Sequence, residues 1–598
     1  MKRTSIAEGL ARLGVRRLLL AIHDVSFPSD LDEDTGRGSP ATKAAARLFA
    51  YAKSLGFTGI QLGPQGQTSR SNPSPYDSTI FGRHVGNIAI QSLRSGGALE
   101  RLVSEEDIDR VLGLAPPVRD VTNADALLAR DGSARARHLA AHDAMHSLVD
   151  LAWRAFLDGA RPDLARPLRD FRATNASWIE REALYLALCA AHDGHGFRSW
   201  PAYERDLWLR TDAVTDLDRR RYADTIDRHA FGQFLVHEEH RRVCAEAERV
   251  GLALYGDLQV GYADADAWAY APVFRRDYAM GAPPSRTNPE GQPWGYPVLD
   301  PAQYGGAARD LVIARAAKMF AEYDSIRIDH PHGLVCPWVY RADDPDPATA
   351  VRAGARLFES PDLADHPALA QLAIARADQI DRAQPRYADR WVRALDAAQV
   401  ERYATLFDAL VECARRHGRD ASDLSCEVLS TMPTPLAAVL ARYDLGRWRI
   451  TQKANLDDPS DVYRAENAQR QDWVMLGNHD TAPIFALLKS WPAAKREQWA
   501  RHLAARLRLE RPERLASDGF FASAMLAELF VSRAQNVSIF FADLFGLEER
   551  FNVPGLVDEA NWSLRLPADF DVMYAERRAR GAALDLELAV ELALTASG

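Results

Sequence analysis

The chain has 598 residues, of which 47% are hydrophobic, and its 73 basic and 83 acidic residues give a formal net charge of −10. This length admits several average domains or one large α/β barrel with insertions, and the hydrophobic content is ample for a large core. The acidic balance argues against a general surface for nucleic acid or anionic membranes. An uncharged substrate is more compatible with it.

The cysteine content and the start of the chain bear on its compartment. The five cysteines are odd in number and scattered, which suggests neither a disulfide framework nor a thiolate zinc site. Residues 1–4 lead into a mixed, charged segment, and no run of about 18 apolar residues occurs anywhere. We therefore expect reduced thiols in a soluble, cytoplasmic protein with no membrane partner.

Short apolar runs that end in polar residues or glycine recur among long helical patterns, which favours a parallel α/β sheet or barrel. Eight runs are predicted to be strands: 18–22, 59–62, 253–258, 325–329, 424–427, 448–452, 474–477 and 537–542. Eight strands match a (β/α)8 TIM barrel, in which reacting groups lie at the C-terminal ends of the strands. The predicted fold class is therefore α/β.

Two gaps between the runs are too long for one crossover helix, so we expect mainly helical insertions beside the barrel. The predicted units are a first part of the barrel at 1–92, a helical insertion at 93–249, and the remainder at 250–598 with a second helical insertion at about 340–420. His142 and His146 lie four residues apart in the first insertion. No acidic or cysteine partner is suitably placed, so a helix face is expected there rather than a metal site.

The segment 325–333 carries a candidate nucleophile. Arg327 and Asp329 share one side of the predicted strand, because strand side chains alternate. Arg327 would hold Asp329 ionised, as a nucleophile or an electrostatic stabiliser, and Pro331 with Gly333 predicts a loop just beyond. From these residues alone, an ordinary Arg–Asp pair that caps a strand is an equal alternative.

Two further carboxylates follow predicted strands. Glu427 ends the fifth run behind apolar residues, and desolvation there would favour the protonated form that a general acid requires. Asp480 follows the seventh run, with His479 before it. Because the C-terminal ends of barrel strands share one face, Asp329, Glu427 and Asp480 are expected to lie together.

Aromatic and acidic residues suggest a carbohydrate site at that face. Tyr76 lies in a proline-rich loop after the second run, where its ring could stack on a sugar or simply pack in a turn. Asp257 ends the third run, and Asp266 and Trp268 follow in the predicted loop. Carbohydrate sites use this mixture, because carboxylates accept hydrogen bonds from sugar hydroxyls while aromatic faces cover the apolar side of a pyranose.

A long segment at 281–295 is rich in proline and glycine but also contains Gln292 and Trp294. We expect an ordered but movable loop, and long ordered loops on a barrel are usually functional.

In chain order, these segments resemble the motif series of the 4-α-glucanotransferases, the amylomaltases of glycoside hydrolase family 77. The resemblance runs from about residue 15 to 567. The matching motifs are Gly63-Pro64, Ser74-Pro75-Tyr76, Gly256-Asp257, Asp266-Ala267-Trp268, Gly281-Ala282-Pro283-Pro284, Gly291 to Gly295, Arg327 to His330, Glu427, His479-Asp480, Arg550 to Gly555 and Asn561-Trp562.

The resemblance implies an α-amylase-type barrel and assigns roles to three carboxylates. Asp329 corresponds to the nucleophile, Glu427 to the acid/base, and Asp480 to the residue that binds and distorts the sugar in the central subsite. The substrate-contact positions that the resemblance implies are Tyr76, Asp257, Gln292, Trp294, Arg327, His330 and His479.

The neighbours of these residues depart from the family pattern. Ser285 replaces the usual Asp after Gly-x-Pro-Pro, Tyr296 replaces the Asn of Trp-Gly-Asn-Pro, and Pro331-His332 replaces Phe-Arg after the nucleophile motif. The carboxylates are retained while their surroundings differ. We therefore place more weight on the reaction class than on the acceptor or chain-length preference.

The predicted function is retaining transfer of α-1,4-glucosyl or maltosyl units between maltooligosaccharides or α-glucans through a covalent glycosyl-enzyme. A retaining pair should have carboxyl groups on the order of 5 Å apart, whereas an inverting pair needs roughly 6.5–9.5 Å. The chemistry needs two carboxylates in opposite protonation states, so no metal or organic cofactor is expected.

Three alternatives remain open. The first is an α-glucan hydrolase with the same mechanism. The second is a metal-dependent barrel hydrolase in which His330 and His332 form a ligand pair completed by His479 or Asp480. The third is a non-catalytic paralogue that binds glucans.

Overall fold

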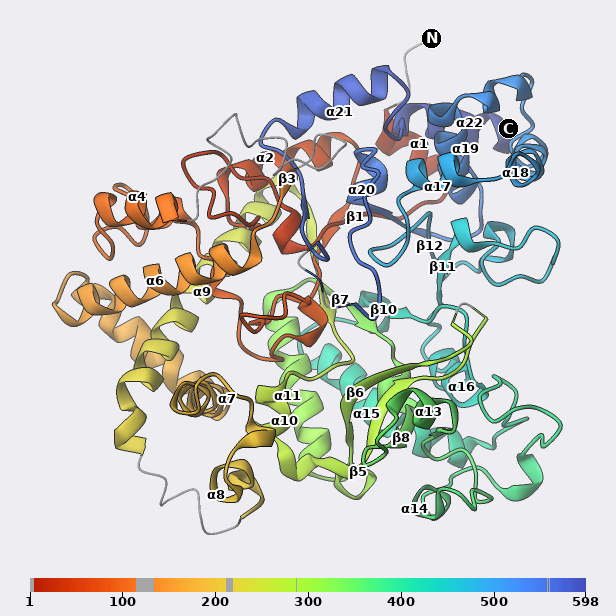
Figure 1. Cartoon of the computed structure of the whole chain (residues 1–598). Coiled ribbons are helices and arrows are strands. Elements are labelled where there is room, and N and C mark those ends of the chain that lie inside the picture. The colour runs from red at the N-terminus through yellow and green to blue at the C-terminus, as the bar shows by residue number, and fades with distance from the viewer. Residues whose placement is uncertain (1–4, 115–133, 211–218, 287, 557, 559) are drawn as a thin grey trace.

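Eight parallel strands form the central sheet of the computed structural model, which describes residues 5–114, 134–210, 219–286, 288–556, 558 and 560–598 (Figure 1). The strands are β1 (Arg17–Ala21), β2 (Gly59–Gln61), β4 (Ala253–Leu258), β7 (Ser325–Asp329), β10 (Leu424–Glu427), β11 (Trp448–Ile450), β12 (Trp473–Met475) and β13 (Asn536–Phe540). Each overlaps one of the eight predicted runs, which confirms the (β/α)8 barrel and the α/β class.

The strand order is β10-β7-β4-β2-β1-β13-β12-β11. At the seam between the two outer strands, the backbone N–H of Trp448 donates to the carbonyl of Val428 at 3.2 Å, which nearly closes the barrel. The strands are buried on both faces, because helices cover the outside and side chains fill the inside. This double burial is the reason that most of them appear in the sequence as short runs rich in apolar residues.

Helices surround the barrel, and the two ends of the described chain meet on it. Helix α1 (Ile6–Arg12) packs against the C-terminal helix α22 (Leu586–Ser597). The other helices beside the barrel are α2 (Lys43–Ser54), α11 (Ala307–Glu322), α15 (Ala397–Arg416), α16 (Thr434–Ala441), α17 (Ile484–Ser490), α18 (Ala493–Arg506), α19 (Asp518–Phe530), α20 (Phe541–Leu544) and α21 (Phe570–Ala579). No described helix is both long and apolar enough to cross a membrane.

The segment predicted as a helical insertion at 93–249 is largely helical in its described part and lies to one side of the barrel (Figure 1). Residues 115–133 and 211–218 of this segment lie outside the described residues, as do residues 1–4 at the start of the chain. The helices of this region are α3 (Ile90–Leu93), α4 (Glu105–Leu114), α6 (His138–Leu157), α7 (Ala165–Ala191), α8 (Ala202–Arg205) and α9 (Ala223–Val250). Helices α7 and α9 pack along each other.

A small antiparallel sheet stands where the sequence analysis predicted loop and helix. The segment 281–295 is the turn region of a hairpin between β5 (Phe274–Ala282) and β6 (Gln292–Leu299), not one long loop. The sequence signal was weak because prolines and glycines interrupt the alternation of side chains.

The segment after β7 also differs from the predicted helical insertion at about 340–420. Its first half contributes β8 (Trp338–Arg341) and β9 (Ala355–Arg356) to the small sheet, with only the short helices α13 (Pro347–Arg352) and α14 (Pro367–Ala370). The long helix at its end, α15, packs against α11 as part of the barrel wall.

Candidate active site

The C-terminal ends of β4, β7 and β10 bring three carboxylates around one guanidinium. Asp257 lies beside Arg327 in the register of β4 and β7, and Asp329 lies beside Glu427 in the register of β7 and β10. Arg327 Nη1 donates to both carboxylate oxygens of Asp257 at 2.7 Å. Its Nη2 lies 3.3 Å from Asp329 Oδ1 and 2.5 Å from Glu427 Oε1. Arg327 therefore neutralises a buried cluster rather than a single acid.

This arrangement corrects two details of the sequence analysis. The principal partner of Arg327 is Asp257, which the strand register places beside it, and its contact with Asp329 is the longest of the three. The surroundings of Glu427 are buried but not simply apolar, because the guanidinium lies against them. Burial raises the pKa of Asp257 to about 7, although Arg327 opposes this shift.

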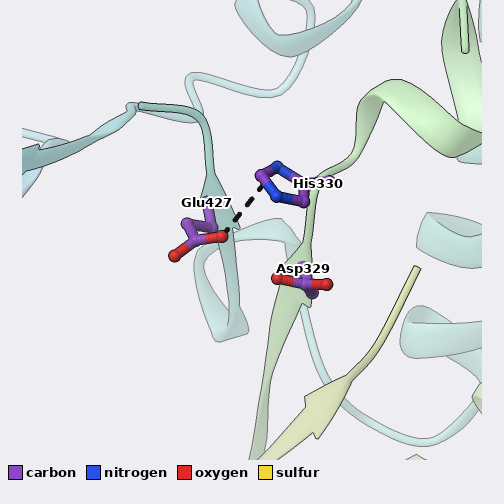
Figure 2. Close-up of side chains that lie close together, drawn as sticks. All are labelled: Asp329, His330 and Glu427. Carbon is purple, nitrogen blue, oxygen red and sulfur yellow. Dashed lines mark ion pairs between the residues drawn. The ribbon is translucent and has the colours of Figure 1, made fainter. Parts of the chain in front are cut away.

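Asp329, His330 and Glu427 converge at the mouth of the barrel. Figure 2 shows the two carboxylates at the ends of neighbouring strands, with the imidazole of His330 beside Glu427. One oxygen of each carboxylate and one ring nitrogen of His330 lie within 4.8 Å of one another. His330 has a φ of 42°, a conformation that a residue with a Cβ rarely adopts. Strain of this kind is typical of functional sites.

The chain beyond His330 is a one-turn helix, α12 (His332–Val335), rather than the predicted loop. Pro331 precedes this turn, where a proline can begin a helix because it needs no backbone donor there. His332 is consequently directed elsewhere, and its Nε2 lies 3.2 Å from the carbonyl of Thr431.

These contacts disfavour the metal-dependent alternative. The oxygen and nitrogen atoms of Asp329, His330 and Glu427 are close enough to hold a cation. However, the fixed positive charge of Arg327 already lies against both carboxylates and would repel a second cation. His332, the other member of the expected ligand pair, does not belong to any group of possible ligands found among the described residues.

Tyr76 and His479 form an aromatic wall beside the carboxylates. The Tyr76 hydroxyl donates to Asp257 Oδ2 at 3.1 Å, and its ring stacks on that of His479 with centroids 5.1 Å apart. Burial and the charge of Arg327 lower the pKa of His479 to about 3. Its imidazole is therefore neutral near pH 7 and can both donate and accept hydrogen bonds.

Asp480 faces the cleft from the loop after β12. Its Oδ1 accepts a hydrogen bond from Asn552 Nδ2 at 2.6 Å. Removal from water raises the pKa of Asp480, and the bond from Asn552 opposes this shift. Asn552 had no predicted role, although it lies inside one of the motifs that carried the family resemblance.

Two more rings lie beside those of Tyr76 and His479, and neither had a predicted role, although Trp562 belongs to one of the motifs that carried the family resemblance. The ring centroid of Trp562 lies 5.7 Å from that of His479, and the backbone of Trp562 is left-handed, with a φ of 58°. The His23 ring lies 5.2 Å from that of His479. A Cβ on Gly63 would fall 2.1 Å from the His23 ring, so glycine is required there. The one sequence signal for His23 was its position directly after the first predicted strand, at the end of the barrel where reacting groups lie.

An open cleft of about 660 Å³ runs over these groups. Of the catalytic and substrate-contact positions that the family resemblance implies, all line the cleft except Asp257 and Arg327, which are buried beneath it. Trp294 stacks on His330 with ring centroids 5.1 Å apart, and its indole N–H donates to Gln292 Oε1 at 3.1 Å. The cleft thus combines aromatic faces with clustered carboxylates, which suits a neutral sugar chain.

Two residues predicted to contribute to a sugar site do not reach the cleft. Trp268 is completely buried in α10 (Asp264–Ala269), where it packs against Trp200, and its indole N–H donates to the carbonyl of Glu204. Asp266 is also buried, and its carboxylate accepts the backbone N–H of Ile80. The predicted sugar contacts of these residues are wrong, because the segment after β4 is a packed helix and not a loop.

This placement predicts that Trp268→Phe lowers stability and leaves sugar affinity unchanged. The substitution removes a buried hydrogen bond and some packing volume, for an expected loss of about 1–3 kcal/mol in the free energy of unfolding. Urea unfolding and titration of maltooligosaccharides would measure the two effects. A weakened sugar affinity in a variant that is otherwise folded would contradict the assignment.

Comparisons with known proteins agree with this geometry. The family model of the 4-alpha-glucanotransferases of glycoside hydrolase family 77 matches residues 22–570. The 4-alpha-glucanotransferase of Thermus thermophilus is 29% identical over 222 residues, which cover 35% of this chain and 43% of that protein. A chloroplastic/amyloplastic 4-alpha-glucanotransferase of Oryza sativa subsp. japonica is 23% identical over 413 residues, which cover 67% of this chain and 59% of that protein. The matches thus span only part of these relatives.

Two solved structures share the fold. An amylomaltase from Streptococcus agalactiae, in complex with acarbose, superposes with a TM-score of 0.69 at 18% identity and covers 95% of this chain and 100% of its own. The amylomaltase from Corynebacterium glutamicum gives a TM-score of 0.64 at 16% identity and covers 97% of this chain and 77% of its own. With a family match over most of its length, the chain belongs to the 4-alpha-glucanotransferase family, glycoside hydrolase family 77.

Proposed function

We propose that this protein is a retaining 4-α-glucanotransferase. The observation that carries the proposal is the placement of Asp329 and Glu427 on register-paired strand ends, with carboxylate oxygens within 4.8 Å of each other. Retaining glycosidases separate their two carboxyl groups by about 5–5.5 Å, whereas inverting enzymes need roughly 6.5–9.5 Å to admit a water molecule. The short separation supports double displacement.

In the first step, Asp329 attacks the anomeric carbon of the donor while Glu427 gives a proton to the departing glycosidic oxygen. The C–O bond to the leaving sugar breaks as the bond to Asp329 forms. Arg327 stabilises the carboxylate charge of Asp329 before the attack and that of Glu427 after its proton has left. Asp480, held by Asn552, is placed to bind ring hydroxyls and to favour the flattened oxocarbenium-like ring.

In the second step, Glu427 accepts a proton from a hydroxyl of the incoming sugar, whose oxygen then attacks the anomeric carbon and releases Asp329. The acceptor enters on the side of Glu427, where Trp294 and His330 present stacked rings. An aromatic face there can hold a glucose ring and exclude water. Two inversions at one carbon retain the α configuration.

The proposed substrates are α-1,4-glucans or maltooligosaccharides as donors and sugars as acceptors. The names of the relatives and the acarbose complex of the Streptococcus agalactiae amylomaltase support this class. We also infer that the described helices within 93–249 form a subdomain beside the barrel, and that the protein acts in the cytoplasm, as its composition suggests.

Incubation with maltotriose should yield glucose and maltooligosaccharides longer than the donor. Each transfer breaks one glucosidic bond and forms another, so the concentration of reducing ends should stay nearly constant. Trp294→Ala should raise the ratio of hydrolysis to transfer several-fold, because it removes the ring available to hold the acceptor. Chromatography of the products and a reducing-end assay measure both quantities.

Trp491→Phe is a suitable control, since Trp491 is buried in the core far along the chain from the hairpin and does not line the cleft. If reducing ends rise in step with donor loss and no product exceeds the donor in length, the protein is instead an α-glucan hydrolase. If the donor is bound but not consumed, the protein is a glucan-binding paralogue.

A further inference from the structure

A hydrogen bond between the side chains of Tyr296 and Asp77, called the bridge below, separates the catalytic cleft from a neighbouring cavity. The Tyr296 hydroxyl, on β6, donates to Asp77 Oδ1 in the loop after β2 at 2.7 Å. Beyond this bridge lies a cavity of about 750 Å³ between the barrel and the helices of the 93–249 segment. Asn72, Asp77, Trp294 and Tyr296 line both the cleft and the cavity, so the two spaces meet at the bridge.

The Asp77 end of the bridge is firmly anchored. Asn72 Nδ2 donates to the other carboxylate oxygen of Asp77 at 2.9 Å, and Asn72 Oδ1 accepts the backbone N–H of Ser74 at 3.0 Å. Prolines at positions 73 and 75 restrict the same loop. A carboxylate whose Oδ2 is held by Asn72 of the same stiff loop presents its Oδ1 as a fixed acceptor for the Tyr296 hydroxyl.

The Tyr296 end is fixed by packing. A Cβ on Gly261 would lie 2.7 Å from the Tyr296 ring, so the ring rests on the bare backbone of this glycine. Burial and the neighbouring carboxylate of Asp77 raise the pKa of Tyr296 well above its usual value. The hydroxyl therefore stays protonated and remains a hydrogen-bond donor throughout the working pH range.

The bridge lies on the side of the cleft where the acceptor enters. Glu427, the proposed acid, stands beside the leaving oxygen, and His330 Nδ1 is 4.0 Å from its Oε2. Trp294 stacks on His330, and the Tyr296 ring centroid is 6.1 Å from that of Trp294. Following these contacts outward from Glu427 leads to the bridge.

We propose that the Tyr296–Asp77 bridge determines acceptor length by ending the acceptor side of the cleft. This inference rests on the proposed transferase function and adds a specificity-determining residue to it. With the bridge in place, the cleft offers no contacts to sugar units beyond the first one or two of the acceptor. Acceptors of greater length should therefore have nearly the same kcat/KM as short ones. Tyr296 occupies a position where the family pattern has asparagine. An asparagine side chain is shorter than tyrosine and would not reach Asp77 from β6.

Removing the bridge would join the cleft to a cavity whose lining can bind hydroxyls. Glu182 and His229 are buried there, with Glu182 Oε1 and His229 Nε2 3.6 Å apart, and neither atom makes a hydrogen bond to another described residue. Asp264 also lines the cavity. Each additional sugar hydroxyl bound by such groups should raise kcat/KM for a longer acceptor. One or two new hydrogen bonds correspond to a preference of about tenfold for the longer acceptor over glucose.

The experiment measures transfer from maltotriose to labelled glucose, maltose, maltotriose and maltotetraose as acceptors. The quantity compared is the ratio of kcat/KM for the longest acceptor to that for glucose. The wild-type protein should give a ratio near one. Tyr296→Ala should raise it about tenfold, and Tyr296→Phe, which keeps the ring but loses the hydrogen bond, should raise it less and in the same direction.

Tyr443→Phe is the matched control, because Tyr443 donates to Asp408 at 2.5 Å in another Tyr–Asp hydrogen bond and does not line the cleft. Its ratio should equal that of the wild type. Transfer with an unchanged ratio in both Tyr296 variants overturns this inference alone, and if Tyr296→Ala does not fold, Tyr296→Phe decides. Absence of transfer by the wild-type protein overturns the proposed function, and this inference with it.

Discussion

Asp329→Asn is expected to lower the turnover of every donor by at least about a thousandfold, because the amide cannot form the covalent glycosyl ester. Glu427→Gln should also stop transfer from maltooligosaccharides, whose leaving oxygen requires a proton. Glu427→Gln should nevertheless react once with an α-glucosyl fluoride, since fluoride departs with little protonation. The result would be protein that carries one added hexose.

Intact-protein mass spectrometry measures this adduct, and proteolysis should locate it on Asp329. Asp480→Asn is an informative companion variant, because it keeps both reacting groups. It weakens only the binding of the sugar-ring hydroxyls by residue 480, whose side chain Asn552 positions. Its defect should appear in both steps. Hexose labelling that persists in Asp329→Asn protein would show that another group is the nucleophile.

The barrel could be predicted because its strands are buried on both faces. The predicted run 18–22 is apolar throughout, and 537–542 contains a single polar residue, Ser538; burial of this kind is visible in sequence without any knowledge of neighbours. The positions of Asp329 and Glu427 followed from the strand ends. The β5–β6 hairpin was not recognised, because its glycines and prolines suggest a turn while its strand pairing depends on β8.

The contacts within the site were harder to predict than its members. That Arg327 chiefly binds Asp257 depends on the register between β4 and β7, which alternation within one strand cannot give. The bond from Asn552 to Asp480 joins loops after different strands. For Trp268 a contact was predicted that does not exist. Its position beside acidic residues suggested a sugar contact, but tertiary packing buries the side chain.

Arg327→Met is expected to destabilise the protein by about 3–5 kcal/mol at neutral pH, because it leaves the buried carboxylates of Asp257, Asp329 and Glu427 without their counter-charge. Turnover should also fall steeply, since the two reacting acids lose the group that holds their charges. Arg449→Met is the matched control. Arg449 pairs with one buried carboxylate, Asp472, just before β12 at the N-terminal end of the barrel.

The loss of stability should grow as the pH rises. The pKa of Asp257 is about 7 in the folded protein, above its ordinary value of 3.8, so the stability that this group contributes is complete below about pH 4 and is lost as the pH rises through 7. Arg327 opposes the shift, and its removal should raise the folded-state pKa further. Below about pH 7, Asp257 is protonated in the folded state of both proteins, so its contribution to the gap between wild type and Arg327→Met is constant. From about pH 7 to pH 9, urea unfolding should show that gap widen by up to about 1.4 kcal/mol per pH unit, because Asp257 then ionises in the wild type but stays protonated in the variant. A gap that stays constant above about pH 7 would mean that Arg327 acts through packing and not by neutralising the carboxylate cluster.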